Sequence, residues 1–215
     1  MFYIVRTMKN NAIWVAALLI SGCGFAHAET ALHNDSFFPW NVGDSWVYQT
    51  INKKTKDVFP MNVTIKETWK EGDQAGIIMV QKDKRGQMRQ FMLKNEKGIF
   101  LEKLGLSKSF TPEVFTRFDS PVPAVIFPLI PGTKVHWEGR LHVLTVNQKI
   151  VYDGLVVGWE DVTVPAGNFH CIKIHFHEMR DKDVVDEDAW YAENVGQVKY
   201  DGGQYIKELK SFKVQ

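Results

Sequence analysis

The sequence predicts an all-β fold in which mainly antiparallel strands form a curled sheet, a half-barrel or a barrel. From about residue 37 onward, apolar and polar residues alternate with a period of two, as in residues 61–65. Gly, Asn, Asp and Pro interrupt these runs at short intervals, and the runs are rich in β-branched and aromatic residues. Many short strands at close spacing favour one antiparallel sheet that curls on itself.

The expected strands follow one another with little chain between them. Residues 83–86 (Asp-Lys-Arg-Gly) are typical of a hairpin tip, and residues 165–168 (Pro-Ala-Gly-Asn) are typical of a tight turn. Strands are predicted over residues 44–50, 61–65, 77–81, 88–93, 98–104, 134–147, 150–164, 169–179, 189–192, 197–200 and 205–214.

The segment 105–132 breaks the alternating pattern. It holds five of the eight prolines, with phenylalanine, valine, isoleucine and leucine between them. Because proline donates no backbone hydrogen bond, we expect a long loop or a short helix that plugs one end of the sheet. The alternative is a lid over an apolar cavity, since long irregular loops are often functional.

The first residues are typical of an export signal. Arg6 and Lys9 form a basic start, and the apolar run 12–20 follows it. Nine residues span only about 14 Å as a helix, which is too short to cross a bilayer permanently. We therefore predict a signal peptide over 1–22, or alternatively over 1–28, then a tether over 23–36 and a single β-rich domain over 37–215.

Two cleavage signals compete at the end of this leader. Residues 20–23 (Ile-Ser-Gly-Cys) resemble a bacterial lipobox, in which Cys23 accepts the lipid and becomes the first mature residue. Residues 26–28 (Ala-His-Ala) before Glu29 are an acceptable site for ordinary signal peptidase, which cleaves after Ala28. In the first case the chain is a palmitate-bearing lipoprotein. In the second it is a periplasmic or secreted protein.

Charge and cysteine content exclude several classes of protein. Without residues 1–22 the chain keeps 24 of its 26 basic residues against 25 acidic ones, so no strong field attracts nucleic acid. The two cysteines are Cys23 and Cys171. If Cys23 is acylated or removed, the fold cannot depend on an intramolecular disulfide. We expect Cys171 to be an inert, packed thiol, because it lies in an alternating apolar strand.

No set of residues in the sequence predicts catalysis or a cofactor. The block Gly43-Asp44-Ser45 is found in a serine-hydrolase family, but no histidine here has an aspartate three residues before it to complete that machinery. His175 and His177 are two apart on one strand face and are weak candidates for a metal site, since a third ligand is missing. We expect no catalytic residues, no resident metal and no cofactor.

Three blocks of the mature sequence resemble a known family. They are residues 38–48 (FPWNVGDSWVY), 164–174 (VPAGNFHCIKI) and 190–200 (WYAENVGQVKY). Together they are similar to a broad family of exported bacterial β-proteins of unknown function, many of them lipoproteins. The resemblance implies this fold and a place in the cell envelope. It supplies no activity and no catalytic residues.

These observations favour a non-catalytic lipoprotein domain of the cell envelope. Gly24 follows Cys23, and by the sorting rule of Gram-negative lipoproteins this implies the periplasmic face of the outer membrane. The expected work is binding of a partner protein or of an apolar ligand. One alternative is a periplasmic carrier or chaperone of lipid or lipoprotein. Another is a soluble secreted protein of unknown function.

Overall fold

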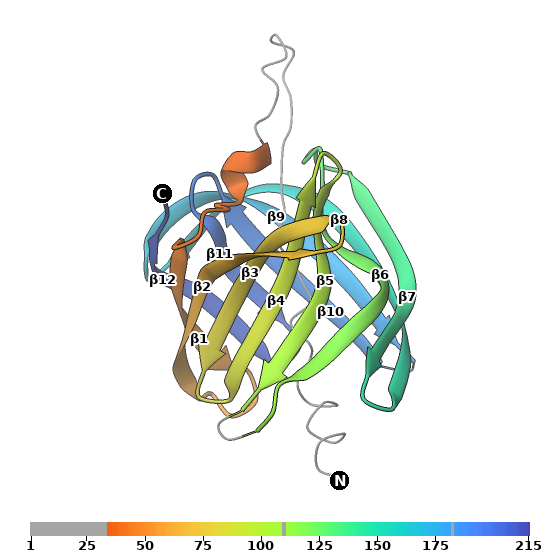
Figure 1. Cartoon of the computed structure of the whole chain (residues 1–215). Coiled ribbons are helices and arrows are strands. Elements are labelled where there is room, and N and C mark those ends of the chain that lie inside the picture. The colour runs from red at the N-terminus through yellow and green to blue at the C-terminus, as the bar shows by residue number, and fades with distance from the viewer. Residues whose placement is uncertain (1–33, 109–110, 182) are drawn as a thin grey trace.

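Twelve antiparallel strands close into a barrel in the computed structural model, which describes residues 34–108, 111–181 and 183–215 (Figure 1). Each strand pairs with its neighbours along the chain, and β1 pairs with β12 to complete the ring. The predicted all-β, barrel-like fold class is confirmed. The strands are β1 Ser45–Asn52, β2 Val58–Glu71, β3 Gln74–Asp83, β4 Gly86–Asn95, β5 Gly98–Ser107, β6 Val114–Ile126, β7 Lys134–Val143, β8 Val146–Val164, β9 Gly167–Arg180, β10 Asp183–Ala192, β11 Gly196–Gly202 and β12 Tyr205–Lys213.

Local sequence explains why these strands form and where they turn. In β1 every second side chain is buried, as the alternation of its sequence predicts. The predicted hairpin tip lies between β3 and β4, where Gly86 takes a positive φ of 141°. The predicted turn at residues 165–168 joins β8 to β9, and Gly167 there has a φ of 132°.

The prediction for the proline-rich segment is wrong: more than half of it is strand, namely the end of β5 and all of β6. Pro121 lies in a part of β6 that does not pair with β5. The pairing is interrupted between Arg117, which pairs with Lys103, and Val122, which pairs with Leu101. Pro123 pairs with β5 on one side, while β7 pairs only with Thr116–Phe118. Proline is tolerated where a strand bulges or pairs on one side, so this strand can contain two of them. Val122, Val125 and Leu129 of this segment pack in the core, whereas Phe115 and Ile130 are exposed.

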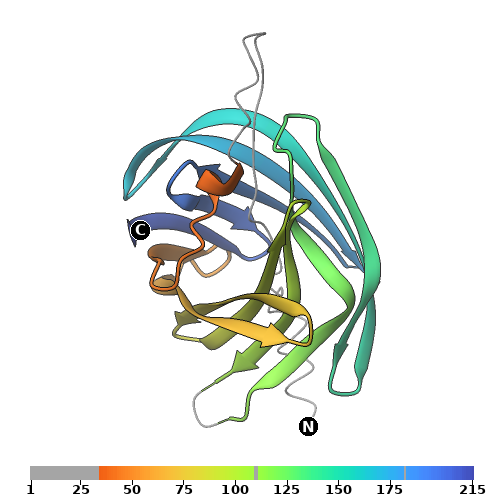
Figure 2. The ribbon, with the colours of Figure 1, turned by 45° about the horizontal axis from the view of Figure 1, so that its top comes forward.

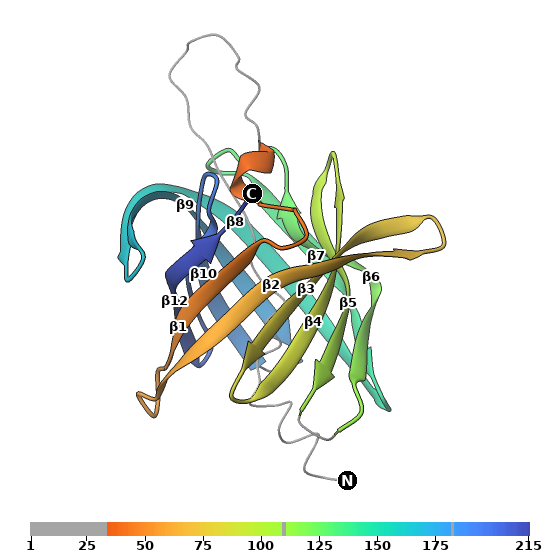
Figure 3. The ribbon, with the colours of Figure 1, turned by 60° about the vertical axis from the view of Figure 1, so that its left-hand side comes forward.

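A 3₁₀ turn, η1 (Asn34–Phe37), sits at one end of the barrel (Figures 1 and 3). The Leu129 backbone N–H donates to Asn34 Oδ1 over 3.3 Å, and Ser36 Oγ donates to Glu193 over 2.9 Å. We call this the η1 end. The turns β1–β2, β3–β4 and β5–β6 lie at the opposite end, which we call the distal end (Figure 1).

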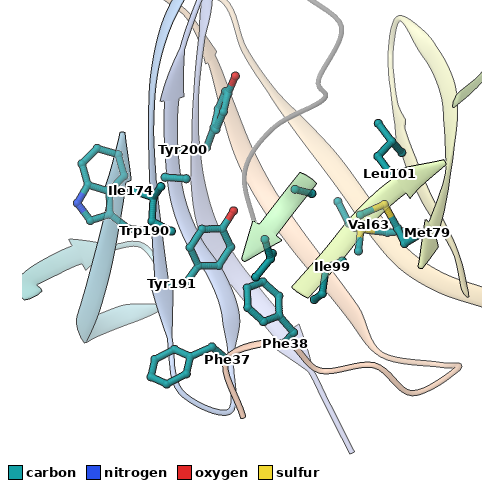
Figure 4. Packing of buried hydrophobic residues seen from close by; sticks show 14 of the residues in the cluster. Phe37, Phe38, Val63, Met79, Ile99, Leu101, Ile174, Trp190, Tyr191 and Tyr200 are labelled. Atoms are coloured by element: carbon teal, nitrogen blue, oxygen red, sulfur yellow. The ribbon is translucent and has the colours of Figure 1, made fainter. Parts of the chain in front are cut away.

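The barrel interior is packed with side chains from opposite walls (Figure 4). Phe38 enters from the η1 end, and its ring centroid lies 5.5 Å from that of Tyr191. Val63 and Met79 approach from the β2–β3 wall, whereas Tyr191 and Tyr200 belong to the facing wall (Figure 4). The contact of Phe38 with Tyr191 thus joins the η1 end of the core to β10 through two aromatic rings.

Two hairpins extend beyond the barrel wall. The long β8–β9 hairpin sweeps past its neighbours (Figures 2 and 3), and the Ala166 N–H donates to the Leu209 carbonyl of β12 over 2.9 Å. At the end of β2–β3, Trp69 donates through Nε1 to the Met92 carbonyl of β4 over 3.3 Å. Gly76 pairs with Trp69, so a small residue lies where the β3 backbone meets β4.

Candidate functional site

The predicted lipidation site and the alternative cleavage site both lie outside the described residues. Cys23, Ala28 and Glu29 precede Asn34, where the description of the chain begins. The identity of the first mature residue therefore remains a prediction from sequence. Within the described part of the chain, no helix has the length and apolarity needed to cross a membrane.

His175 and His177 lie on the outer face of β9, as the alternation predicts. His175 Nδ1 is 2.9 Å from Asp188 Oδ1, and His177 Nδ1 is 2.7 Å from Asp186 Oδ1 across the β9–β10 pair. The hydrogen bond from His177 lowers the pKa of Asp186 below its usual value. Among the described residues, no three His, Cys, Asp or Glu side chains are arranged to hold a metal ion. Both imidazoles instead take part in cross-strand polar pairs.

The same pairing recurs at the other described histidines. Each has a ring nitrogen within hydrogen-bond distance of an aspartate on a neighbouring strand, at 2.6 or 2.7 Å. The pairs are His136–Asp153, His142–Asp119 and His170–Asp161. These side chains are exposed, so each pair contributes little to stability.

Cys171 is buried and free, with a pKa raised to about 12 mainly by burial. Its thiol therefore stays protonated at physiological pH and is a poor nucleophile. This agrees with the expectation of an inert, packed cysteine. Ser45, the serine of the hydrolase-like block, begins β1 and pairs with Lys213 and Thr64, so its backbone belongs to the sheet.

The distal half of the interior contains ionisable groups that sequence reasoning missed. Glu178 and Arg180 of β9 form a buried ion pair, with Arg180 Nη2 2.9 Å from Glu178 Oε2. Glu187 of β10 accepts a hydrogen bond from the Tyr200 hydroxyl of β11 and is only 2% exposed. Burial raises the pKa of the Glu187 carboxyl to about 7. Glu187 alternates with the buried residues Ala189 and Tyr191, and its side chain points into the barrel.

Lys207 of β12 extends this polar interior toward the η1 end. Its Nζ donates to Gln197 Oε1 over 3.1 Å and lies 4.4 Å from the Tyr200 ring centroid. The side chain is 3% exposed, and burial lowers its pKa to about 7. Lys207 alternates with Tyr205 and Leu209, which are both buried. The period of two in β12 therefore indicates that the Lys207 side chain points into the barrel.

The cavity beside Lys207 is small. Its volume is about 40 Å³, which holds roughly three water molecules. Ligand pockets commonly measure about 300–1,000 Å³, so this space is far below the size of a lipid site. Its lining is mixed: Lys207 and three glutamines face aromatic and aliphatic side chains. The glutamines are Gln81, Gln90 and Gln197.

Residues 144–212 match the family model described as DUF3108-like. This range covers β8–β12 and contains two of the three blocks on which the family resemblance rests, 164–174 and 190–200. The expected similarity to a family of exported β-rich proteins of unknown function is confirmed at this level. Block 38–48 lies outside the matched range.

Two solved structures are similar to the chain. One is a protein of Bacteroides fragilis, provisionally described as exported and as having a YmcC-like fold. It is 17% identical, with a TM-score of 0.49, covering 82% of this chain and 98% of that one. The other, from Parabacteroides distasonis and provisionally described as a lipoprotein, is 16% identical, with a TM-score of 0.46 and the same coverage. No curated protein matches the chain.

Proposed function

We propose that this chain is a non-catalytic lipoprotein of the bacterial cell envelope, anchored through acylated Cys23, whose barrel binds a partner protein on its outer surface. The observation that carries the anchor is the lipobox-like block 20–23 directly after a signal-type apolar run. Gly24 favours the periplasmic face of the outer membrane.

The packed interior supports an outer binding surface rather than an inner one. Phe38, Tyr191 and Tyr200 fill the space that an apolar ligand would need, and each is almost fully buried. The cavity of about 40 Å³ contains the polar end of Lys207. These features argue against the lipid carrier that we considered as an alternative, because a carrier needs a roomy apolar cavity. A partner must then be recognised by exposed strands and turns.

The anchor can be tested by expressing the full chain in a Gram-negative host and measuring the intact mass of the mature protein. We expect a chain that begins at Cys23 and carries acyl chains, and a palmitate analogue should label it. Cys23→Ala should abolish labelling and release the protein from the membrane fraction. Cys171→Ala is the matched control, because it removes the other cysteine and should keep the label.

A different mass would contradict the proposal. A wild-type chain that begins at Glu29 without acyl mass would show that signal peptidase cleaves after Ala28. The protein would then be the soluble periplasmic or secreted form that the second cleavage signal predicts. Equal labelling of wild type and Cys23→Ala would likewise exclude Cys23 as the acylated residue.

A further inference from the structure

The distal end of the barrel carries a cleft that is lined mainly by basic residues. The cleft measures about 460 Å³ and lies between the β3–β4 turn and the end of β5. Its charged lining consists of four cations and one acid, Lys82, Lys84, Arg85, Lys108 and Asp83. This volume lies within the range of ordinary ligand pockets. The cleft is larger and more open to solvent than the cavity beside Lys207, and it has room for several side chains.

The packing of two of these cations fixes the shape of the cleft. Arg85 Nε donates to Asp83 over 2.9 Å, and its guanidinium lies 4.3 Å from the Tyr205 ring centroid. Lys84 Nζ lies 3.0 Å from Asp57 of the β1–β2 turn and 4.6 Å from the Phe59 ring centroid. The contacts with the Tyr205 and Phe59 rings orient the two side chains and join two neighbouring turns.

Other cations at this end are exposed to solvent. Lys82 and Lys108 are exposed, and neither forms an ion pair with any described residue. Lys54 and Lys56 of the β1–β2 turn are exposed as well. We call these six cations, with Asp57 and Asp83, the distal basic surface. Its two acids are each paired with one of the six cations, so a net positive charge faces solvent.

Three turns of the η1 end, β2–β3, β4–β5 and β10–β11, show no such excess of cations. They carry three acids and one base, Asp73, Glu96, Glu193 and Lys97. The chain from Cys23 reaches the barrel at Asn34, and this link spans at most about 40 Å. The distal end lies a further strand length away, about 33 Å for ten residues. The chain from an anchor at Cys23 therefore joins the barrel at the end opposite the distal basic surface.

We infer that the distal basic surface docks an acidic segment of another envelope protein. This inference rests on the proposed anchor for its orientation and names the chemistry of the partner. A segment rich in Asp and Glu matches the unpaired lysines, and the cleft takes its side chains between Lys82 and Lys108. An anionic bilayer carries the same charge as such a segment, but the chain from Cys23 joins the barrel at the opposite end and leaves the distal basic surface open to a protein partner.

The test measures binding of a fluorescent oligoglutamate peptide to the full chain purified in detergent. We expect saturable binding that weakens with salt and that falls roughly tenfold in the double variant Lys82→Gln/Lys108→Gln. The double variant Lys66→Gln/Lys134→Gln removes the same charge from exposed lysines near the η1 end and should leave the affinity unchanged. Lys82→Arg/Lys108→Arg should bind like the wild type.

Three outcomes would overturn the inference. The first is that the wild type does not bind the peptide. The second is that both glutamine variants lose the same affinity for it, and the third is that the arginine variant binds the peptide as weakly as Lys82→Gln/Lys108→Gln. Vesicles of phosphatidylglycerol and phosphatidylethanolamine serve as the second probe. Binding of vesicles but not of peptide through Lys82 and Lys108 would identify a lipid surface instead and exclude the protein partner. Peptide binding does not require acylation, so a mature chain starting at Glu29 would refute the anchor and leave this measurement valid.

Discussion

At the residue scale, the least expected feature is a set of ionisable side chains inside a small barrel. Burial disfavours the charged form of both Glu187 and Lys207, which moves their pKa values toward each other, each to about 7. Tyr200 contacts both groups, through a hydrogen bond to Glu187 and through its ring face to Lys207. The interior charges therefore affect the free energy of unfolding near neutral pH.

Glu187→Gln should change how stability depends on pH. The pKa of Glu187 is raised in the fold, so the native state holds a proton that the unfolded state has already released between about pH 4.5 and 7. Wild-type unfolding free energy should therefore fall as pH rises through this window, by about 2 to 3 kcal/mol from this group. The glutamine variant should lack this fall, as measured by urea unfolding at pH 5, 6, 7 and 8.

Glu96→Gln is the control for this experiment, since it removes an exposed carboxyl from the β4–β5 turn. Its pH profile should follow that of the wild type. If Glu187→Gln also follows the wild-type profile, the carboxyl of Glu187 is not held in a desolvated site, and its role in the interior polar group has been misassigned.

At the element scale, the alternation of residues located most of the strands, and local chemistry located the turns. The hairpin tip at 83–86 and the turn at 165–168 were predicted because glycine at positive φ and proline act through their own backbone. β6 was missed for the complementary reason. Whether a proline breaks a strand depends on whether a neighbour needs its N–H, and that is decided by β5 and β7 rather than by the sequence of β6.

The candidate site residues show the same contrast: positions set within one strand were predicted, and partners on a neighbouring strand were not. His175 and His177 were placed on one strand face correctly, because two residues on one strand obey a local period. Their aspartate partners on β10 required the register of two strands, which the sequence did not supply. Glu187 lies between two acidic residues, Asp186 and Asp188, so the local charge pattern alone favours an exposed position for it. Its burial follows from the alternation with Ala189 and Tyr191.

Gly76→Ala tests the close approach of the β2–β3 hairpin to β4. A Cβ at Gly76 would lie 1.8 Å from the Met92 carbonyl oxygen, which belongs to the backbone and cannot rotate away. We expect a loss of at least about 1–3 kcal/mol in unfolding free energy, measured by thermal or urea denaturation.

Gly72→Ala provides the comparison for that variant. Gly72 is in the adjoining turn with a φ of 60°, and a Cβ there would meet nothing within 4 Å. Gly72→Ala should therefore lower the free energy of unfolding by only about 1 kcal/mol, through backbone strain at positive φ. A Gly76 variant as stable as the wild type would mean that the β3 and β4 backbones can separate without cost, contrary to the packing around Trp69.

At the scale of the whole molecule, closure of the ring links distant parts of the sequence. β1 pairs with both β2 and β12, and the tip of β8–β9 reaches Leu209 of β12. The core includes Phe38 from the start of the domain and Leu209 from its end. The described residues therefore share one hydrophobic core, and folding should be a single cooperative transition.

A fragment limited to residues 144–212 should not fold alone, although this range matches the family model. It lacks β1 and β7, so β12 and β8 would become open edges, and the inward side chains of β8–β12 would lose the facing wall. Circular dichroism and hydrogen exchange of the isolated fragment should show no protected sheet. A protected, monomeric fragment would instead show that the β8–β12 half is an independent folding unit.

The position of Gln215 has a practical consequence. Its backbone N–H donates to Asp44 Oδ1 over 3.0 Å, and Asn41 Nδ2 donates to its carbonyl oxygen over 3.3 Å, so the end of β12 is fastened beside the entry to β1. A fluorescent reporter or affinity tag fused after Gln215 would emerge next to the point where the chain arrives from Cys23. Such a fusion would leave the far side of the molecule unobstructed for capturing whatever binds there in living cells.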